Sequence, residues 1–398
     1  MQNYNLKLYL EINNSNFIFY VVENNENEEL KIAHKLDVCL EEFKNNRISD
    51  LEKVFNKIKK NIYLIEQKFN YTFKELILIL ENFQPSFVNL TGFKKLNGSQ
   101  ILRENITYIL NTLKSYIDET EREKTILHIF NSKFDLDKKK IDNVPIGLFG
   151  DFYSHELSFV LINTNDLKNL KIIFDKCNLK IKKTFVKSFI KGANISNEYN
   201  NIESFYYIKI SKDSSKIFYF ENNSLKYEQD FNFGADIILK DISKVTSLKL
   251  DEVKEILNKI ELTDKLNNDD LLEEEFFNKS NYIKIKKKLI YEIALARITE
   301  ISELIIFKNI NLKYNNHELK EIFLEISSQL QLKGLKKIYK SVFSTNSKLH
   351  LNLIEELSNK NLIDTANKLA HYGWKKEAIP ITQSEKSLIG RFFEAIFG

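Results

Sequence analysis

Glycine, proline and cysteine are all scarce in this 398-residue chain, and each shortage excludes a class of protein. The chain has 10 glycines and 3 prolines, where average usage would give about 28 and about 20. Collagen-like, proline-rich and glycine/serine-linker chains are therefore excluded. The glycines fit neither a G-x-x-x-x-G-K-[ST] phosphate loop nor a G-x-G-x-x-G dinucleotide fingerprint. Two cysteines, Cys39 and Cys177, are too few for a disulfide scaffold and indicate a reducing compartment.

Long hydrophobic runs and an excess of one charge are also lacking. The longest clean apolar run covers residues 76–80, far short of the ~18 residues that span a bilayer. Met1–Tyr4 lacks the basic and apolar regions of a signal peptide, so we expect a cytosolic protein. Basic and acidic residues, 59 and 55, are interspersed, which predicts no nucleic-acid partner. The six histidines are scattered, which predicts no metal site and no catalytic histidine cluster.

Hydrophobic periodicity predicts an α/β start to the chain. Residues 6–22 form two β-runs around a polar turn, 51–69 have helical spacing, and 75–80 form a short buried strand. A second hairpin, at 206–210 and 217–221, repeats the opening one. Two similar hairpin starts in an α/β chain predict a duplicated fold.

The rest of the chain continues the alternation of helices and strands. We expect helices at 101–117, 166–177, 237–246, 250–260, 283–308 and 362–372, and strands at 125–130, 157–162, 179–185 and 322–326. The stretch 267–275 is acidic and polar, which predicts an exposed loop. A polar linker at 375–383 separates the final segment from everything before it.

That final segment, 384–398, predicts an amphipathic helix. Thr382-Gln383-Ser384-Glu385 fits a capping box. Six apolar residues then share one helical face: Leu388, Ile389, Phe392, Phe393, Ile396 and Phe397. A helix of this kind is typical of an interfacial membrane anchor, although it can also pack back on the protein core. One copy would bind lipid weakly, so the anchor needs many copies that act together.

Several motifs, in order, carry a resemblance to a known family. In residues 126–150 a strand containing Leu127-His128 precedes Val144-Pro145-Ile146-Gly147-Leu148-Phe149-Gly150. A strand at 157–162 and a helix at 165–177 follow, and the helix ends in Cys177-Asn178-Leu179. Later come FNFGADIILKDI at 231–242 and Arg297-Ile298-Thr299-Glu300-Ile301. In this order the motifs resemble FtsA, the actin-like bacterial cell division protein, over nearly the whole chain.

The resemblance implies a fold and a domain plan. The fold would be α/β and actin-like (duplicated ribonuclease-H-like), with two lobes, a small inserted α+β subdomain and a C-terminal amphipathic helix. The first lobe would comprise 1–82, 173–195 and 341–374, and the inserted subdomain, a polymer contact, would be 83–172. The second lobe would comprise a core, 196–233 with 297–340, and an outer subdomain, 234–296. A linker at 375–383 and the membrane helix at 384–398 would follow.

The resemblance also implies where a nucleotide would bind. Actin-like ATPases use glycine-rich turns, because backbone N–H groups must approach the phosphates, and an Asp at each hairpin positions Mg²⁺. Here all three turns are altered. Glu11 and Asn13 replace Asp and Gly in the first hairpin, Lys209 replaces the acid of the second, and Glu325 and Ile326 fill the third turn. The remaining positions of this degenerate site are Asn14, Ser15, Ser211, Lys212, Asp213, Ser214 and Ser327.

These replacements predict a pseudo-ATPase with no catalytic residues. A lysine at the metal-facing position repels Mg²⁺, and side chains in place of glycine hold the backbone away from phosphate. Asn13 still tolerates a left-handed backbone, and Lys209 and Lys212 remain able to bind phosphate without a metal. Binding of ATP with Mg²⁺, by a still-active actin-like ATPase or a sugar-kinase relative, stays open as the less favoured alternative.

By the same resemblance, the chain would be an adaptor that ties FtsZ filaments to the cytoplasmic face of the inner membrane at the division septum. The FtsZ C-terminal peptide would dock near Arg297 and Glu300, beside a basic strip made of Lys284, Lys286, Lys287 and Lys288. Further partners would be other copies of the chain, lipid and other division proteins. The alternative within this fold is a PilM-like scaffold of type IV pilus assembly, which needs no terminal anchor.

Overall fold

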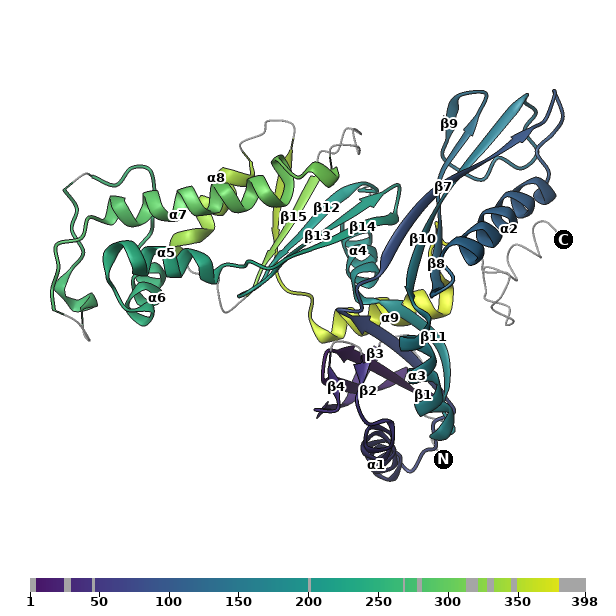
Figure 1. Ribbon diagram of the computed structural model, residues 1–398, viewed down its shortest axis with the longest axis horizontal. Helices are drawn as coiled ribbons and strands as arrows, with labels where there is room; N and C mark the ends of the chain where they lie inside the picture. Colours follow the sequence, from purple (N-terminus) through teal and green to yellow (C-terminus); the bar gives the residue numbers. More distant parts are fainter. Residues whose placement is uncertain are drawn as a thin grey trace. The chain divides into compact units, whose positions relative to one another are not determined.

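The computed structural model describes residues 5–24, 30–44, 47–199, 202–267, 269–277, 281–312, 321–327, 333–344 and 349–378. The chain divides into two compact units (Figure 1). Unit 1 contains Met1–Glu203, Glu221–Tyr227 and Leu357–Gly398, and unit 2 contains Ser204–Phe220 and Glu228–Glu356. Within the described ranges, no helix has the length and the hydrophobicity that crossing a membrane requires.

A five-stranded sheet forms the base of unit 1, in the order β11-β6-β1-β2-β3. The strands β1 (Asn5–Asn13), β2 (Asn16–Asn24) and β3 (Leu30–Cys39) are antiparallel, while β6 (Glu75–Glu81) is parallel to β1 and to β11 (Lys180–Val186). A short hairpin, β4 (Phe43–Lys44) with β5 (Arg47–Ile48), follows β3.

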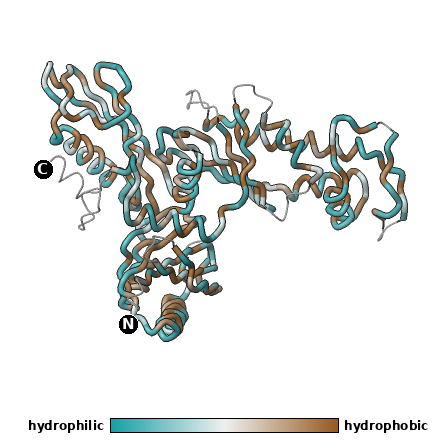
Figure 2. The backbone as a smooth tube through the Cα atoms, turned by 180° about the vertical axis from the view of Figure 1, so that it is seen from behind, coloured by the Kyte–Doolittle hydropathy of each residue, from teal (hydrophilic) through white to brown (hydrophobic). Residues whose placement is uncertain are grey.

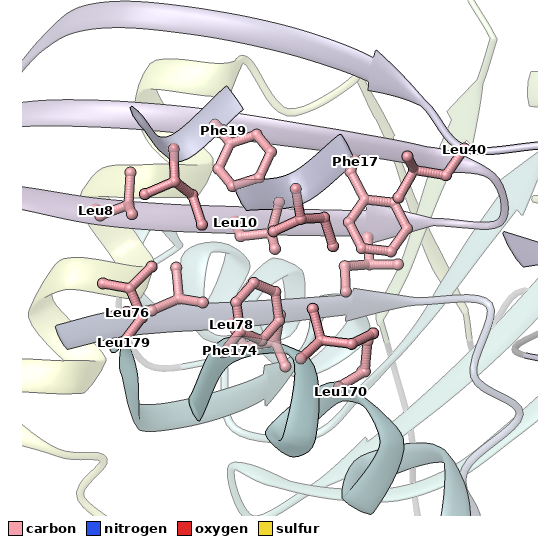
Figure 3. Packing of buried hydrophobic residues seen from close by; sticks show 14 of the residues in the cluster. Leu8, Leu10, Phe17, Phe19, Leu40, Leu76, Leu78, Leu170, Phe174 and Leu179 are labelled. Atoms are coloured by element: carbon pink, nitrogen blue, oxygen red, sulfur yellow. The ribbon is translucent and has the colours of Figure 1, made fainter. Parts of the chain in front are cut away.

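Helices cover both faces of this sheet. The helices α1 (Leu51–Phe69) and α3 (Thr164–Lys176) share one hydrophobic core with the sheet, whereas α4 (Lys187–Glu198) and α9 (Asn359–Tyr372) pack together on the other side. Because strand residues alternate between faces, Leu8, Leu10, Leu76 and Leu78 all point toward α3. Figure 3 shows them against Leu170 and Phe174 of that helix, and the hydrophobic stretches of the strands are brown in Figure 2.

A second sheet of unit 1 has the order β7-β10-β8-β9. Its strands are β7 (Ser86–Lys95), β8 (Lys124–Leu136), β9 (Lys139–Ile141) and β10 (Phe152–Asn163). Helix α2 (Arg103–Thr120) packs on β7 and β10, and this layer has separate hydrophobic clusters. It therefore has the layers and cores of a small α+β subdomain.

The first residues after α9 lie along one edge of strand β8. The amide of Asn131 donates to the Lys376 carbonyl at 2.6 Å, and the amide of Ala378 donates to the Ile129 carbonyl at 2.7 Å. Buried Trp374 donates from Nε1 to the Asn223 carbonyl at 2.7 Å. The chain is thus held on the second sheet up to Ala378, where its described part ends.

Unit 2 is built on a sheet with the order β14-β13-β12-β15-β16. Its strands are β12 (Phe205–Ile210), β13 (Ser215–Glu221), β14 (Ser224–Phe231), β15 (Glu321–Ile326) and β16 (His350–Ile354). An antiparallel hairpin, β12–β13, lies beside the parallel strands β15 and β16. The first sheet of unit 1 has the same topology, so the predicted duplication is confirmed.

Four helices accompany this sheet: α5 (Asp236–Thr246), α6 (Leu250–Lys259), α7 (Lys287–Ser302) and α8 (Lys333–Phe343). Helix α7 contacts α5 and α8 (Figure 1). Short helical turns occur at Glu274–Phe276 and Ile310–Leu312. The predicted helix at 283–308 is wrong at both ends, because α7 begins at Lys287 and gives way to a π-helical turn, Glu303–Phe307, after Ser302.

Candidate functional site

The carboxyl ends of the parallel strands in unit 1 bring three charged side chains together. Glu11 is near the end of β1, Glu81 ends β6, and Lys187 begins α4 directly after β11. Lys187 Nζ lies 2.6 Å from Glu11 Oε1 and 2.8 Å from Glu81 Oε2. Tyr20 also donates its hydroxyl to Glu11 Oε2 at 3.1 Å. One lysine is therefore shared by two carboxylates at this edge.

This triad, Glu11, Glu81 and Lys187, is buried. The Glu11 side chain is 3% exposed, and those of Glu81 and Lys187 are 17% exposed. Burial alone would lower the pKa of Lys187, but the Glu81 and Glu11 carboxylates raise this pKa above its ordinary value. Burial, and then the charge of Glu11, raises the pKa of Tyr20. Lys187 is therefore charged at neutral pH, and Glu11 already has a cationic partner.

The hairpin beside the triad makes the tight turn that the sequence predicts, with one difference. Strands β1 and β2 are joined by Asn14 and Ser15, and the residue with a left-handed backbone is Asn14, at φ 50°, rather than Asn13. Asn13 instead accepts a hydrogen bond from Asn82 Nδ2 at 2.8 Å. The Ser15 carbonyl accepts from the Leu40 amide at 2.7 Å, so other parts of the lobe hold this turn.

In unit 2, Lys209 lies between two carboxylates. The parallel register of β12 and β15 places Lys209 directly opposite Glu325, and Lys209 Nζ lies 3.7 Å from Glu325 Oε1 and 3.6 Å from Glu356 Oε1. Glu325 is 1% exposed and accepts the Tyr207 hydroxyl at 2.5 Å. Two residues that the sequence predicts in separate turns of the nucleotide site thus form one ion pair.

The loop after β12 closes onto the start of helix α5. The Ala235 amide donates to the Ser211 carbonyl at 2.9 Å, and the Asp236 amide donates to the Lys212 carbonyl at 3.0 Å. At Gly234, a Cβ atom would lie 2.4 Å from the Ser211 carbonyl oxygen. Backbone N–H groups at a helix start can bind anions, but these two already donate to protein carbonyls.

The residues expected to bind a partner peptide are partly engaged within unit 2. Arg297 pairs with Asp241 and with Glu300, and Lys287 pairs with Glu273 at 2.5 Å. Lys284 and Lys286 precede α7, and Lys288 is in its first turn. At 100° per residue, Arg297 faces α5, away from a cavity of about 490 Å³ between α7 and α8. That cavity is lined by Leu295, Thr299, Ser302, Glu303, Phe307, Ser341 and Val342.

Sequence reasoning missed the partners of these charged groups. Glu81 ends the apolar run of β6, and Lys187 directly follows Phe185 and Val186 at the end of β11. Residues that end neighbouring parallel strands meet at one edge, so these positions carried a usable signal. The positions of Tyr20 and Glu356 in the sequence carried no such signal. Of the predicted site residues, the six expected to bind the membrane (Leu388, Ile389, Phe392, Phe393, Ile396 and Phe397) lie outside the described residues.

Comparisons with known proteins give a consistent result. No protein-family model matches the chain. The cell division protein FtsA of Buchnera aphidicola subsp. Acyrthosiphon pisum (strain APS) is 20% identical over 402 residues, which cover 98% of this chain and 94% of that protein. FtsA of Buchnera aphidicola subsp. Baizongia pistaciae (strain Bp) is 23% identical over 339 residues, 80% of this chain and 76% of that protein.

Among solved structures, the PilM-PilN type IV pilus biogenesis complex has a chain of the same fold. Its TM-score is 0.50 at 11% identity, and the match covers 92% of this chain and 97% of that chain. The repeated sheet topology in the two units agrees with this likeness. In sequence over most of its length, and in its actin-like fold, the chain therefore resembles a diverged FtsA cell division protein.

Proposed function

We propose that this protein is a cell division adaptor that anchors FtsZ filaments to the cytoplasmic face of the inner membrane and helps to assemble the septum. The observation that carries the proposal is the similarity to FtsA over 98% of the chain. The protein would be peripheral and concentrated at the division site. In this proposal it keeps the FtsA plan of two lobes, an inserted subdomain, an outer subdomain, a linker and a terminal helix, with three changes of boundary. Residues 341–356 belong to unit 2, α3 belongs to the first lobe, and the linker begins after Ala378.

We further propose that the nucleotide site is degenerate. The acid of the first hairpin, Glu11, is paired with Lys187, and the residue in place of the second acid, Lys209, is paired with Glu325. Mg²⁺ needs free carboxylate oxygens, and Glu11 would have to give up its ammonium partner to supply them. In each unit the charged residue thus has a partner of opposite charge in the protein itself, and no ligand is needed to balance it. This supports a binding role over catalysis.

We expect no Mg²⁺-dependent binding of ATP tighter than about 1 mM, equivalent to roughly 4 kcal/mol, and no phosphate release above background. Isothermal titration calorimetry with ATP, with and without Mg²⁺, and a phosphate-release assay check this. Binding in the micromolar range that disappears with EDTA would contradict the degenerate site, while leaving the adaptor role intact. Weak binding without Mg²⁺ would point to Lys209 and Lys212 as phosphate ligands.

The outer part of unit 2 is the proposed docking surface for the FtsZ C-terminal peptide. Lys284, Lys286 and Lys288 supply positive charge at the start of α7, and the cavity between α7 and α8 supplies an apolar recess. Since Arg297 pairs with Asp241 and Glu300, we propose that it positions α7 against α5. A peptide carboxylate that binds Arg297 would compete with both acids.

The second sheet of unit 1 is the proposed contact for self-association. Phe93 and Phe152 are 59% and 41% exposed, and their rings stack with centroids 5.6 Å apart. Leu148 and Phe149, in the stretch that resembles FtsA, are 47% and 71% exposed. Large apolar side chains gathered on one small subdomain are typical of a protein contact, and a polymer would give the terminal helix its avidity.

We expect the full-length protein to bring FtsZ filaments down with sedimenting vesicles, and a chain truncated after residue 383 to leave them in the supernatant. The reason is that the six apolar residues of the terminal helix would insert at the lipid interface. Co-sedimentation with vesicles of phosphatidylethanolamine and phosphatidylglycerol measures the effect. As a control, Phe392→Ser/Phe393→Ser keeps the length of the tail and should fail in the same way.

A PilM-like scaffold is the second candidate, favoured by the fold likeness to the PilM-PilN complex. The vesicle experiment separates the two candidates. A scaffold of that kind should show the same vesicle binding with and without residues 384–398, and it should not bind FtsZ filaments. Either result, with the full-length chain folded, would replace the adaptor proposal.

A further inference from the structure

Unit 1 has a cavity of about 710 Å³ at the opposite edge of its first sheet from the Glu11 triad. The cavity lies where the parallel strands β1, β6 and β11 begin, beneath the last turns of α9. Its lining comes from β1 (Leu6, Lys7, Leu8), from the approach to β6 and its start (Tyr71–Glu75 and Ile77), from β11 (Lys182) and from α9 (Asn367, Ala370, His371). Ligand cavities in proteins have volumes of roughly 300–1,000 Å³, so the size fits a small molecule.

The lining of this cavity is cationic. It contains three lysines, Lys7, Lys74 and Lys182, together with His371, against a single carboxylate, Glu75. Only Lys182 pairs with Glu75, at 2.6 Å. No carboxylate in the described ranges lies within 4.0 Å of the ammonium of Lys7 or that of Lys74. The cavity therefore presents two positive charges that no carboxylate offsets.

Lys7 is the most informative of these groups, because it is partly buried inside the cavity. Its ammonium donates to Asn367 Oδ1 at 3.0 Å, and the same oxygen accepts the Tyr9 hydroxyl at 2.8 Å. Burial, and then the positive charge of Lys182, lowers the pKa of Lys7. A partly buried ammonium beside a second cation is unfavourable on its own, and a bound anion would relieve it.

The lysines of the cavity are not needed to stabilise the end of α9. Cations often lie near a helix C-terminus because its last carbonyls lack partners. Here the Leu369 carbonyl accepts from Lys183 Nζ at 3.5 Å and from the Gly373 amide at 3.0 Å. Lys183 does not line the cavity. The end of the helix thus has its own lysine, and Lys182 pairs with Glu75, which leaves Lys7 and Lys74 for another role.

The remaining lining is apolar and aromatic. Phe73, Ile77 and Ala370 contribute to the walls, and Tyr71 and Phe73 lie edge to face with centroids 5.0 Å apart. Apolar walls with a few polar groups at fixed positions are the usual composition of a ligand site. We propose that this cavity binds a small organic anion with an apolar body, with its negative group on Lys7 and Lys74, the two lysines that no carboxylate offsets, and its body against Phe73 and Tyr71.

Phenyl phosphate is a suitable probe, with inorganic phosphate and phenol as its two halves. We expect the full-length protein to bind phenyl phosphate in calorimetry and in ligand-observed NMR, and to bind each half at least about tenfold more weakly, a difference of about 1.4 kcal/mol. Lys7→Met and Lys74→Met should each weaken phenyl phosphate binding about tenfold. The matched control is Lys360→Met, because Lys360 is an exposed lysine of α9 that does not line the cavity, and it should leave binding unchanged.

Stability provides the second readout. Since Lys7→Met removes a partly buried charge and keeps the aliphatic stem, its melting temperature should equal or exceed that of the natural protein while anion binding falls. Loss of binding with a lowered melting temperature would mean that Lys7 has a structural role, and the proposal would fail. No binding of phenyl phosphate at 10 mM, or equal binding by all four proteins, would also overturn it. Neither result bears on ATP, FtsZ or vesicle binding.

Discussion

Replacing Gly234 with alanine should destabilise unit 2 by about 3 kcal/mol, at the upper end of the usual cost of overpacking. The added Cβ would lie 2.4 Å from the Ser211 carbonyl oxygen and 2.5 Å from the Lys212 carbonyl oxygen. Both neighbours are backbone atoms, so no side-chain rotation relieves the contact. The loop would have to move, and it would then lose the hydrogen bonds from the Ala235 and Asp236 amides.

Hydrogen exchange read by mass spectrometry tests this best, because a chain of two units need not unfold in one step. Amides of α5 and β12 should lose protection while those of β1 and β6 keep it. Gly98→Asn is the control: Gly98 has φ +79° with its nearest neighbour 4.0 Å away, and asparagine tolerates that backbone. Unchanged protection in the Gly234→Ala variant would show that the loop moves at little cost in stability, and it would contradict the prediction.

The sequence predicts elements well where a hydrophobic pattern is regular. Both hairpins, α1 and the buried strand β6 follow directly from periodicity, because each has one continuous apolar face or run. Strand β7 lacks a fully buried residue, so its pattern is faint. Helix α4 has buried residues all around its circumference, polar ones among them. It therefore shows no hydrophobic stripe from which a helix could be predicted.

The candidate site was predicted residue by residue, but its pairings were not. Glu325 and Lys209 are 116 positions apart in the chain, and only the register of β12 against β15 shows that they face each other. Likewise, the FtsA resemblance predicts that Glu11 substitutes for a metal-binding acid, while in the fold Glu11 is a partner of Lys187. Substitutions at single positions show which interaction is lost, whereas the fold shows which one replaces it.

The largest electrostatic effect should come from Lys187→Met, which we expect to destabilise unit 1 by about 3–5 kcal/mol, the usual cost of removing one partner of a buried ion pair. Glu11 and Glu81 would remain as two buried carboxylates without their cation. Urea unfolding, monitored by hydrogen exchange at the amides of β1 and β6, measures the loss of stability. The double variant Lys187→Met/Glu11→Gln removes one of the charges and should recover part of it.

The pH dependence of this variant distinguishes charge from packing. In the natural protein the pKa of Lys187 is raised, so its contribution is complete below about pH 10.5 and is lost only as pH rises through the higher folded value. From pH 6 to 9 this group should therefore leave stability constant. In Lys187→Met, Glu11 and Glu81 lose the cation that they share and bind protons more readily in the folded state, so stability should rise as pH falls toward 5. A cost that stays constant with pH would mean lost packing.

Divalent cations test whether the Lys187 side chain has replaced a bound metal ion. If the Lys187 ammonium has taken over the charge that a metal would supply, its removal should leave Glu11 and Glu81 able to bind Mg²⁺. Addition of 10 mM MgCl₂ should then raise the melting temperature of Lys187→Met but not that of the natural protein, because a ligand stabilises only a folded state that binds it. Equal shifts for both proteins would mean that Mg²⁺ acts elsewhere, and that the lysine fills a purely structural position.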